Sequence, residues 1–262
     1  MQSSGVIVRT SSSDTTKHLL TTVLQDHWDH VGDLTTFPAC TQLVVGPGFK
    51  KALLPGYPNN KESALLQHDF EGRNVREVDI TTEGTGIKIG RFYAYDYFGD
   101  GSFYLLDTPG HSVGHMCGLA RTTPDTFVLM GGDASHHGGE IRPSEYLPLP
   151  KEVKPSPLKK LATCPGHLLR DIHREKSASE PYYLVTETFP DDLDTCNWTV
   201  AGLQEFDAAE NVLVLVAHDE GVRDILDFYP RSVNGWRAKD LANKARWTFV
   251  ADFEEALIDA QK

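Results

Sequence analysis

The stretch that most constrains the fold of this chain is a short loop rich in metal-binding side chains. It runs Gln25-Asp26-His27-Trp28-Asp29-His30 and directly follows Val23-Leu24, which is typical of the end of a buried strand. Imidazole and carboxylate side chains crowded onto one strand-to-helix loop suit a borderline-soft divalent cation such as zinc. The loop therefore predicts a metal site at the end of a strand.

Three further strand ends carry the same kinds of side chain. Asp107 is followed by Thr-Pro-Gly-His111-Ser-Val-Gly-His115, Asp133 follows two glycines, and His218 follows the apolar run Val212-Leu-Val-Leu-Val-Ala217. Strand ends that meet at one edge of a fold can bring such residues together. We therefore expect four separate strand ends to contribute to a single site.

This order of motifs resembles that of the metallo-β-lactamase superfamily of hydrolases. The resemblance covers the chain from about Leu24 onward and rests on His27-x-Asp29-His30, His111 in a Thr-Pro-Gly-His-Ser-x-Gly-His setting, Asp133 and His218. Trp28 and the run Gly-Gly-Asp-Ala-Ser-His-His-Gly-Gly-Glu around Asp133 are similar to the lactonase-like branch found in fungi. The resemblance implies an α/β fold, a two-sheet αββα sandwich, in a single domain over residues 1–262.

The resemblance also implies a ligand set for two metals that share a bridging aspartate. By position, His27 and His111 hold the first metal, Asp29, His30 and His218 hold the second, and Asp133 bridges them. The expected cofactor is Zn²⁺, one or two ions per chain. Such cations lower the pKa of bound water enough to supply hydroxide near neutral pH. Asp29 is then expected to be the catalytic group that handles the proton passed to the leaving group.

The chain departs from the family pattern at its first motif. The family has His-x-His-x-Asp-His, and Gln25 occupies the position of the first histidine, while only 24 residues precede it where a β-rich segment is usual. We therefore expect a shortened amino-terminal part. An amide oxygen is a poorer ligand for zinc than imidazole. Three alternatives follow: a single metal in the second site, two metals with a water in place of the lost ligand, or a catalytically inactive protein.

Composition limits the partners that the chain can have. A formal net charge of −12 argues against a nucleic-acid partner, because phosphate binding needs a basic surface. The sequence contains no run of about 18 apolar residues, so we expect no membrane span. The start lacks the basic and apolar regions of a secretory signal, and the four cysteines are scattered without a Cys-x-x-Cys pair. These features predict a cytoplasmic protein with reduced thiols.

Local patterns predict the order of the secondary structure. Residues 1–16 are rich in Ser and Thr and are expected to form a flexible tail. We expect strands over 42–46, 75–80, 87–98, 102–106, 115–120, 126–130 and 212–217, with a hairpin turn at Gly99-Asp100-Gly101. We expect a helical turn over 50–54 and helices over 197–210, 222–228 and 253–258.

Residues 135–195 form a Pro-rich region that directly follows Asp133. A loop so long is usually functional or disordered, so we interpret it as a lid or wall over the site, with a plain surface insertion as the alternative. Within it, His136, His137, Arg142 and Tyr146 are weaker candidates for the substrate pocket. We expect His115 to pack behind His111, and His18, His68, His167 and His173 to be ordinary core or surface residues.

The leading functional hypothesis is a metal-dependent hydrolase of an ester-type bond, most directly in a lactone, with a small-molecule substrate. The resemblance and the aromatic, Pro-rich region support it. A thioesterase and a β-lactam hydrolase would use the same chemistry, since fold does not fix the substrate. The alternative from another class is a binding protein that keeps the fold without catalysis.

Overall fold

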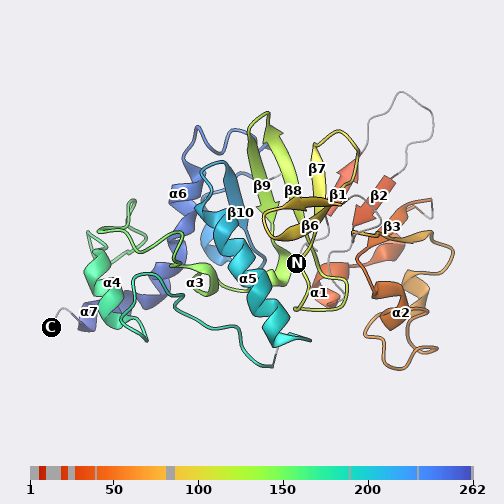
Figure 1. Cartoon of the computed structure of the whole chain (residues 1–262), viewed down its shortest axis with the longest axis horizontal. Helices are drawn as coiled ribbons and strands as arrows, with labels where there is room; N and C mark the ends of the chain where they lie inside the picture. The colour runs from red at the N-terminus through yellow and green to blue at the C-terminus, as the bar shows by residue number, and fades with distance from the viewer. Residues whose placement is uncertain are drawn as a thin grey trace. The chain divides into compact units, whose positions relative to one another are not determined.

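The computed structural model describes residues 6–9, 19–22, 27–38, 40–80, 86–188, 190–228 and 230–260 (Figure 1). For residues 6–9, 19–22 and 28 it describes the backbone alone. The chain has a mixed α/β fold that divides into two compact units: unit 1 consists of Met1–Gly118 and Phe189–Cys196, and unit 2 of Leu119–Thr188 and Asn197–Lys262. We describe each unit by itself, and the single domain predicted over residues 1–262 stays a prediction.

Unit 1 begins with a four-stranded sheet in the order β1 (Val6–Arg9), β2 (Leu19–Thr22), β3 (Gln42–Val45), β4 (Val75–Glu77). β1 and β2 are antiparallel, whereas β2, β3 and β4 are parallel. β1 lies within the segment predicted as a tail, and the remainder of residues 1–16 lies outside the described residues. The strands predicted over 42–46 and 75–80 are confirmed.

The core of this sheet is built from helices and loops that follow the strands. α1 (Trp28–Val31) contributes Val31, and α2 (Phe49–Leu53), at the predicted helical turn, contributes Phe49 and Leu53. These side chains pack with Leu43 and Val45 of β3 in one buried apolar cluster. Burial of apolar area is the main stabilising term, and here it fixes α1 against its own sheet.

Three antiparallel strands complete unit 1: β5 (Ile87–Ile89), β6 (Phe92–Asp96) and β7 (Phe103–Asp107). The prediction of one strand over 87–98 is wrong, because Gly90 has a φ of 60° and turns the chain between β5 and β6. The predicted turn at Gly99-Asp100-Gly101 is confirmed. Both glycines have positive φ, and both backbone N–H groups donate to the carboxylate of Asp96.

Unit 2 contains the end of β8 (Met116–Thr123), whose first three residues belong to unit 1, and then β9 (Thr126–Met130) and β10 (Val212–Leu215). β9 and β10 are parallel, with Val128 opposite Leu213. Both pack on Trp236 and on Leu241 of α6 (Leu241–Arg246). The predicted strands are confirmed, and the two parallel strands end side by side.

The Pro-rich region contains more structure than a bare loop. It includes α3 (Gly138–Ile141) and α4 (Gly166–Ile172). Val153, Leu169 and Tyr182 form a buried apolar cluster with Phe249 and with Leu257 of α7 (Glu254–Asp259), and α4 lies beside α7 in Figure 1. Much of this region is therefore held by a core of its own.

Two of the three helices predicted near the carboxyl terminus are present in the structure and one is not. α5 (Leu193–Ala208) starts four residues before the predicted helix, and α7 matches its prediction closely. The helix predicted over 222–228 is wrong: after the 3-10 segment Glu220–Val222 only one turn follows, and Pro230 disfavours helical backbone just before it. Further 3-10 segments are Leu34–Thr36, Gln67–Asp69, Gly132–Ala134 and Thr248–Phe253.

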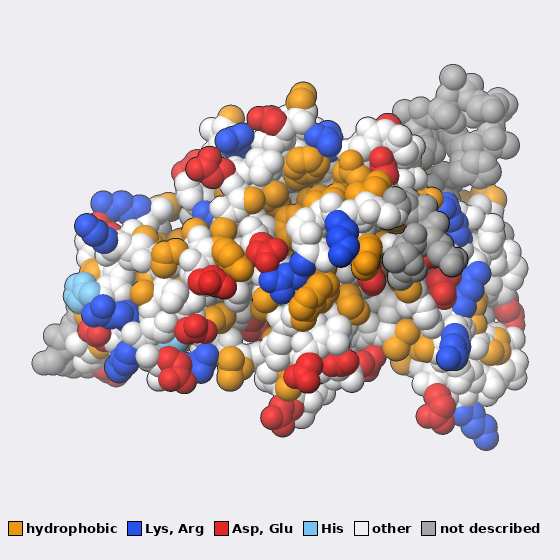
Figure 2. Space-filling view, viewed as in Figure 1, with side chains coloured by type: hydrophobic (Ala, Val, Ile, Leu, Met, Phe, Trp, Pro, Cys, Tyr) orange, Lys and Arg blue, Asp and Glu red, His pale blue; other side chains and the backbone are white. Residues whose placement is uncertain are grey.

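The described helices and the surface bear on the partner predictions. Among the described residues, no helix is long and apolar enough to cross a membrane. On the face drawn in Figure 2, acidic side chains gather around the start of α5, where Asp191, Asp192 and Asp194 are exposed. The negative net charge is therefore displayed on the surface there.

Candidate metal-binding site

The first group of predicted ligands lies on the single turn of α1 in unit 1. The backbone N–H groups of His30 and Val31 donate to the carbonyl oxygen of His27, at 3.0 and 3.2 Å. This turn buries the His30 side chain and leaves the Asp29 side chain one-third exposed, with His30 Nε2 3.5 Å from Asp29 Oδ2. Gly32, with a φ of 64°, then ends the turn.

His27 and His111 meet within unit 1, 84 residues apart in sequence. His27 Nδ1 lies 3.0 Å from His111 Nε2, and the two rings are nearly perpendicular with centroids 4.7 Å apart. Two imidazoles on one tetrahedral zinc place their nitrogens about 3.3 Å apart. The pair therefore fits a shared cation with only a small adjustment, and in its absence a neutral ring can donate to the other.

The segment 189–196 holds the loop that carries His111. The backbone N–H groups of Asp191 and Asp192 donate to the carbonyl oxygens of His111 and Gly110, each at 3.0 Å. Gly110 has a φ of 116°, and a Cβ there would lie 2.2 Å from the backbone nitrogen of Cys196. A glycine is therefore required at this close approach.

His115 packs against His111, as the sequence predicts. The ring centroids lie 5.5 Å apart, and His115 Nδ1 lies 2.9 Å from the carbonyl oxygen of Thr108 and 3.0 Å from its hydroxyl. Burial raises the pKa of the nearby Asp107 carboxyl, and it raises the pKa of the Cys117 thiol to about 12. The Cys117 thiol is therefore protonated at neutral pH and is a poor metal ligand.

The second group of predicted ligands lies in unit 2 at the ends of β9 and β10. Asp133, 3% exposed, has Oδ1 3.3 Å from His218 Nε2 and Oδ2 3.6 Å from His136 Nε2. The rings of His136 and His218 are stacked, 12° from parallel, with centroids 5.6 Å apart. One donor atom from each of the three residues lies within 4.8 Å of the others.

Parallel strand pairing brings Asp133 and His218 together. The ladder of β9 and β10 continues past the strands, because Gly131 N–H donates to the carbonyl of Leu215 at 2.7 Å and Ala217 N–H donates to that of Gly132 at 2.9 Å. His218 then adopts a φ of 63°, which is uncommon outside glycine. The strand ends of unit 2 thus bring Asp133 and His218, two of the predicted ligands, together, and their role as ligands stays a prediction.

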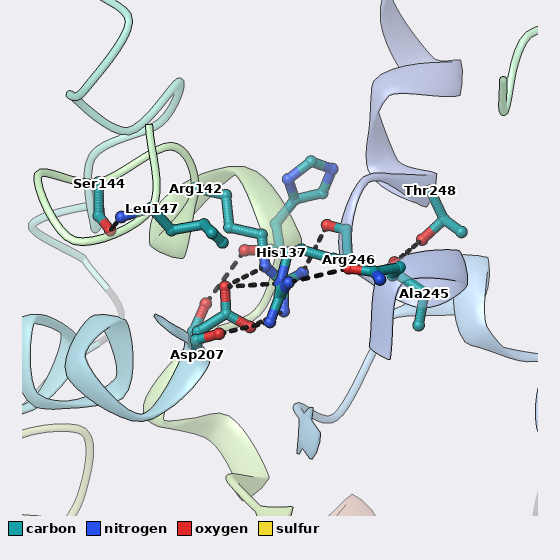
Figure 3. A network of polar contacts seen from close by, with 10 residues as sticks. His137, Arg142, Ser144, Leu147, Asp207, Ala245, Arg246 and Thr248 are labelled. Atoms are coloured by element: carbon teal, nitrogen blue, oxygen red, sulfur yellow. Dashed lines mark hydrogen bonds and ion pairs between the residues drawn. The ribbon is translucent and has the colours of Figure 1, made fainter. Parts of the chain in front are cut away.

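Arg142, predicted to line the substrate pocket, is held in a buried network of hydrogen bonds. Its guanidinium donates to both carboxylate oxygens of Asp207 at 2.8 Å and to the carbonyl of Arg246 at 2.9 Å (Figure 3). Both side chains of the Arg142–Asp207 pair are about 5% exposed or less. Three of the five N–H groups of the guanidinium thus have acceptors inside unit 2, and the pocket role of Arg142 stays a prediction.

The charges of this network stabilise each other. Burial alone would raise the pKa of Asp207, but the charge and hydrogen bonds of Arg142, with Arg246, hold that pKa below its usual value. Burial raises the pKa of Asp219, which follows His218, against the opposing charge of Arg142. The Asp219 carboxylate also accepts from the N–H of Gly221 at 3.0 Å, which fixes the backbone after His218.

The other three pocket candidates lie in different surroundings. His137 Nε2 lies 2.9 Å from Asp252 Oδ2, and its Nδ1 accepts from Gly139 N–H, so both nitrogens have protein partners. Tyr146 is 46% exposed on the Pro-rich region, and its pocket role stays a prediction. His136, by contrast, joins the Asp133 group.

Several sequence-based expectations concern other residues. Gln25 and His18 lie outside the described residues, as does the side chain of Trp28. His68 and His167 are exposed, and His173 is buried with Nε2 2.9 Å from the carbonyl of Glu180, so all three are ordinary residues as predicted. The sequence analysis did not predict that His136 Nε2 would lie 3.6 Å from the Asp133 carboxylate, although its position three residues after Asp133 in a tight turn is a signal that could have indicated it.

Comparison with known proteins places the chain in a family. No family model matches it. A metallo-hydrolase from Annulohypoxylon moriforme is 48% identical over 238 residues, 88% of this chain and 61% of the relative. The γ-lactamase MBL2 from Gibberella moniliformis is 51% identical over 166 residues, 62% of this chain and 69% of the relative.

One solved structure, a quorum-quenching N-acyl homoserine lactone lactonase, matches 80% of this chain and 62% of its own with a TM-score of 0.48 and 18% identity. This chain spans 61% of the length of the Annulohypoxylon relative, so the comparison covers part of that protein. Identity above 40% to named metallo-hydrolases and γ-lactamases, together with the His and Asp motifs, leads to one conclusion. The chain belongs to the metallo-β-lactamase superfamily of hydrolases, in the group that includes these fungal relatives.

Proposed function

We propose that this protein is a metal-dependent hydrolase that opens a small cyclic acyl compound, with a lactone as the leading substrate class. The observation that carries the proposal is the buried Asp133 carboxylate 3.3 Å from His218, at the ends of two parallel strands in a member of a hydrolase superfamily. A buried carboxylate beside imidazoles is a natural ligand for a divalent cation.

The proposal keeps the ligand set that the family resemblance implies. His27 and His111 would hold one zinc ion, Asp29, His30 and His218 a second, and Asp133 would bridge, within the αββα sandwich that the resemblance implies. The support is chemical: within unit 1 the donors already stand in pairs, at 3.0 Å for His27–His111 and 3.5 Å for Asp29–His30. Because Gln25 replaces an imidazole, the first zinc would bind more weakly than the second.

When bound, the zinc ions supply an activated water and polarise the carbonyl group of the substrate. The protein residues then position the reactants and move the proton. Asp29, one-third exposed beside buried His30, would accept the proton of the attacking water and pass it to the ring oxygen as the acyl C–O bond breaks. The product is an open hydroxy acid.

A γ-lactam is the second candidate substrate, because the 51% identical relative is named a γ-lactamase. The attack on the carbonyl carbon is the same in both rings. The leaving group differs: an amine nitrogen must be protonated before it departs, whereas an alkoxide oxygen is a better leaving group. Proton delivery by Asp29 would therefore limit the γ-lactam reaction more strongly.

The test is a substrate panel measured together with metal content. Lactones, γ-lactams, thioesters and β-lactams would be offered to the zinc-loaded protein, with hydrolysis followed by product analysis and zinc by mass spectrometry. We expect opening of a lactone or γ-lactam, abolished in His30→Ala and kept in His167→Ala, which changes an exposed histidine. Hydrolysis unchanged in His30→Ala would refute the proposed centre.

The role of Gln25 has its own test. If a weak first site limits turnover, Gln25→His raises both zinc content and the rate of hydrolysis. If the protein works with one zinc, the variant gains a second ion without a faster reaction. A protein that binds zinc and hydrolyses nothing on the panel, with or without Gln25→His, would be a binding protein instead.

A further inference from the structure

Unit 2 contains three possible metal ligands of its own, one more than the resemblance implies for it. We propose that Asp133, His136 and His218 together bind a divalent cation, so that unit 2 holds one metal ion without ligands from unit 1. The new element is His136 as a metal ligand. This inference deepens the proposed function and rests on it for the identity of the metal.

The distances in the group indicate a shared cation better than they indicate hydrogen bonds. The imidazole nitrogens lie 3.3 and 3.6 Å from the carboxylate oxygens of Asp133. A charge-assisted N–H···O bond is usually about 2.7–2.9 Å long, as in the Arg142–Asp207 pair of the same unit at 2.8 Å. Ligand atoms at about 2.0–2.2 Å from a tetrahedral zinc lie about 3.3–3.5 Å from each other. The observed spacing falls close to that range.

The fold fixes each ligand from a different element. Asp133 follows β9 and His218 follows β10, so the parallel ladder sets their separation. His136 is held by the Glu140 carboxylate, which accepts from the N–H of His136 and from the hydroxyl of Ser135, both at 2.9 Å. Ligands held before the metal arrives lose less conformational entropy on binding.

Burial and access also suit a cation. Asp133 is buried, and a bound cation would offset the cost of burying its carboxylate charge. The imidazoles of His136 and His218 are 30% and 46% exposed, which leaves a route for the ion and a position for water or substrate. Two imidazoles and one carboxylate with an open position form a common type of catalytic zinc site.

The test removes the ligands of unit 1 in the full chain. The quadruple variant His27→Ala/Asp29→Ala/His30→Ala/His111→Ala would be stripped with a chelator, reloaded with Zn²⁺ alone, and assayed for zinc per chain and for affinity by chelator competition. We expect one tightly held zinc. Adding His136→Ala should weaken its binding by more than the 10- to 100-fold that loss of a group behind a ligand costs. If His136 is changed to Asp instead of Ala, the carboxylate restores a ligand atom, and most of the zinc affinity should be recovered.

Two controls separate this proposal from a structural effect. His137→Ala in the same background removes the neighbouring histidine, whose nitrogens contact Asp252 and Gly139, and should leave zinc affinity unchanged. Circular dichroism would verify the fold of each variant, and His136→Gln, which keeps side-chain volume, would replace His136→Ala if that variant does not fold. With Co²⁺ as the probe, loss of the His136 ligand should change the visible absorption spectrum.

Two results would overturn the proposal: no zinc bound by the quadruple variant, or zinc affinity within twofold after loss of His136. These results are distinct from a failure of the proposed function. A wild-type protein that opens lactones, combined with a quadruple variant that binds no zinc, would keep the function and refute the unit 2 site. Tight zinc binding that depends on His136, without hydrolysis of any substrate, would keep the site and refute the function.

Discussion

Unit 2 contains two carboxylates that are equally buried and differently used. Asp133 and Asp207 are each 3% exposed. Asp207 lies 2.8 Å from two guanidinium nitrogens of Arg142, which carry permanent positive charge, whereas the imidazoles near Asp133 stand 3.3 and 3.6 Å away. The Asp207 carboxylate therefore has its counter-charge within the protein. The Asp133 group has the spacing and the ligand types of a group completed by an added cation.

The comparison teaches that burial of an acid does not by itself indicate a functional site. Loss of one partner of a buried ion pair is costly because the other charge stays behind, so the Asp207 group is expected to serve stability. The carboxylate and imidazoles of the Asp133 group, at the spacing of metal ligands, are proposed to serve metal binding instead. The two carboxylates should therefore respond in opposite ways to the same substitution, one in activity and the other in stability.

The largest expected effect is on activity. Asp133→Asn keeps the shape of the side chain but removes its charge, so we expect hydrolysis to fall on the order of 10³-fold or more. The melting temperature of the metal-free protein should stay unchanged or rise, because a buried negative charge is lost. Steady-state kinetics and calorimetry on the same samples measure both. Activity within tenfold of the wild type would show that Asp133 is not a ligand.

The next effect is on stability. Asp207→Asn should lower the free energy of unfolding by about 3–5 kcal/mol, because the Arg142 guanidinium is left buried without its counter-charge. Hydrolysis per folded molecule should change little. Denaturant titration measures the loss. Asp227→Asn is the matched control, since that carboxylate pairs with Arg231 and Lys239 on the surface and its loss should not be resolved. Equal stability of both variants would contradict the contrast.

The sequence predicted the Asp133 group far better than the Asp207 group, and the reason is physical. Three local patterns indicate possible metal ligands at strand ends: the residue type, the glycines that turn the chain and the apolar strand before them. A buried ion pair has no such local pattern, because Arg142 lies in a loop 65 residues from Asp207. One signal was present: Asp207 follows Leu203 by four residues and so lies on the apolar face of α5, where a charge needs a partner.

The same contrast explains which parts of the fold were predicted correctly. β9 and β10 have strong alternating or apolar patterns, and both were predicted within a few residues. The break between β5 and β6 depends on the positive φ of Gly90, which a run of aromatic residues concealed. The core under the Pro-rich region joins residues near Val153 to residues near Phe249, and such distant packing leaves no local pattern.

Metal removal should lower the stability of the folded protein by a smaller amount, and only where the Asp133 group is intact. At a free zinc concentration of 100 times Kd, binding stabilises the folded protein by about 2.7 kcal/mol, and a chelator removes that contribution. We expect the chelator to lower the melting temperature of the wild type and of Asp207→Asn equally, because distant sites act additively. Asp133→Asn should show little further loss. An equal loss in Asp133→Asn would show that the stabilising metal binds elsewhere.

The smallest effect is the response of the Asp207 pair to acid. The pKa of Asp207 in the folded protein is held below its usual value, mainly by the charge of Arg142 against the opposing effect of burial. Its stabilising contribution is therefore complete above the unfolded pKa of about 3.9 and is lost as the pH falls through the folded pKa.

The difference in unfolding free energy between the wild type and Asp207→Asn tests this dependence. It should be constant from pH 7 to about pH 5 and then decrease by at most about 1.4 kcal/mol per pH unit, the limit for one proton. Other carboxylates titrate in both proteins and cancel in the difference. A difference that already decreased between pH 7 and pH 5 would mean that Asp207 is not held ionised by Arg142, and the contrast with Asp133 would lose its electrostatic basis.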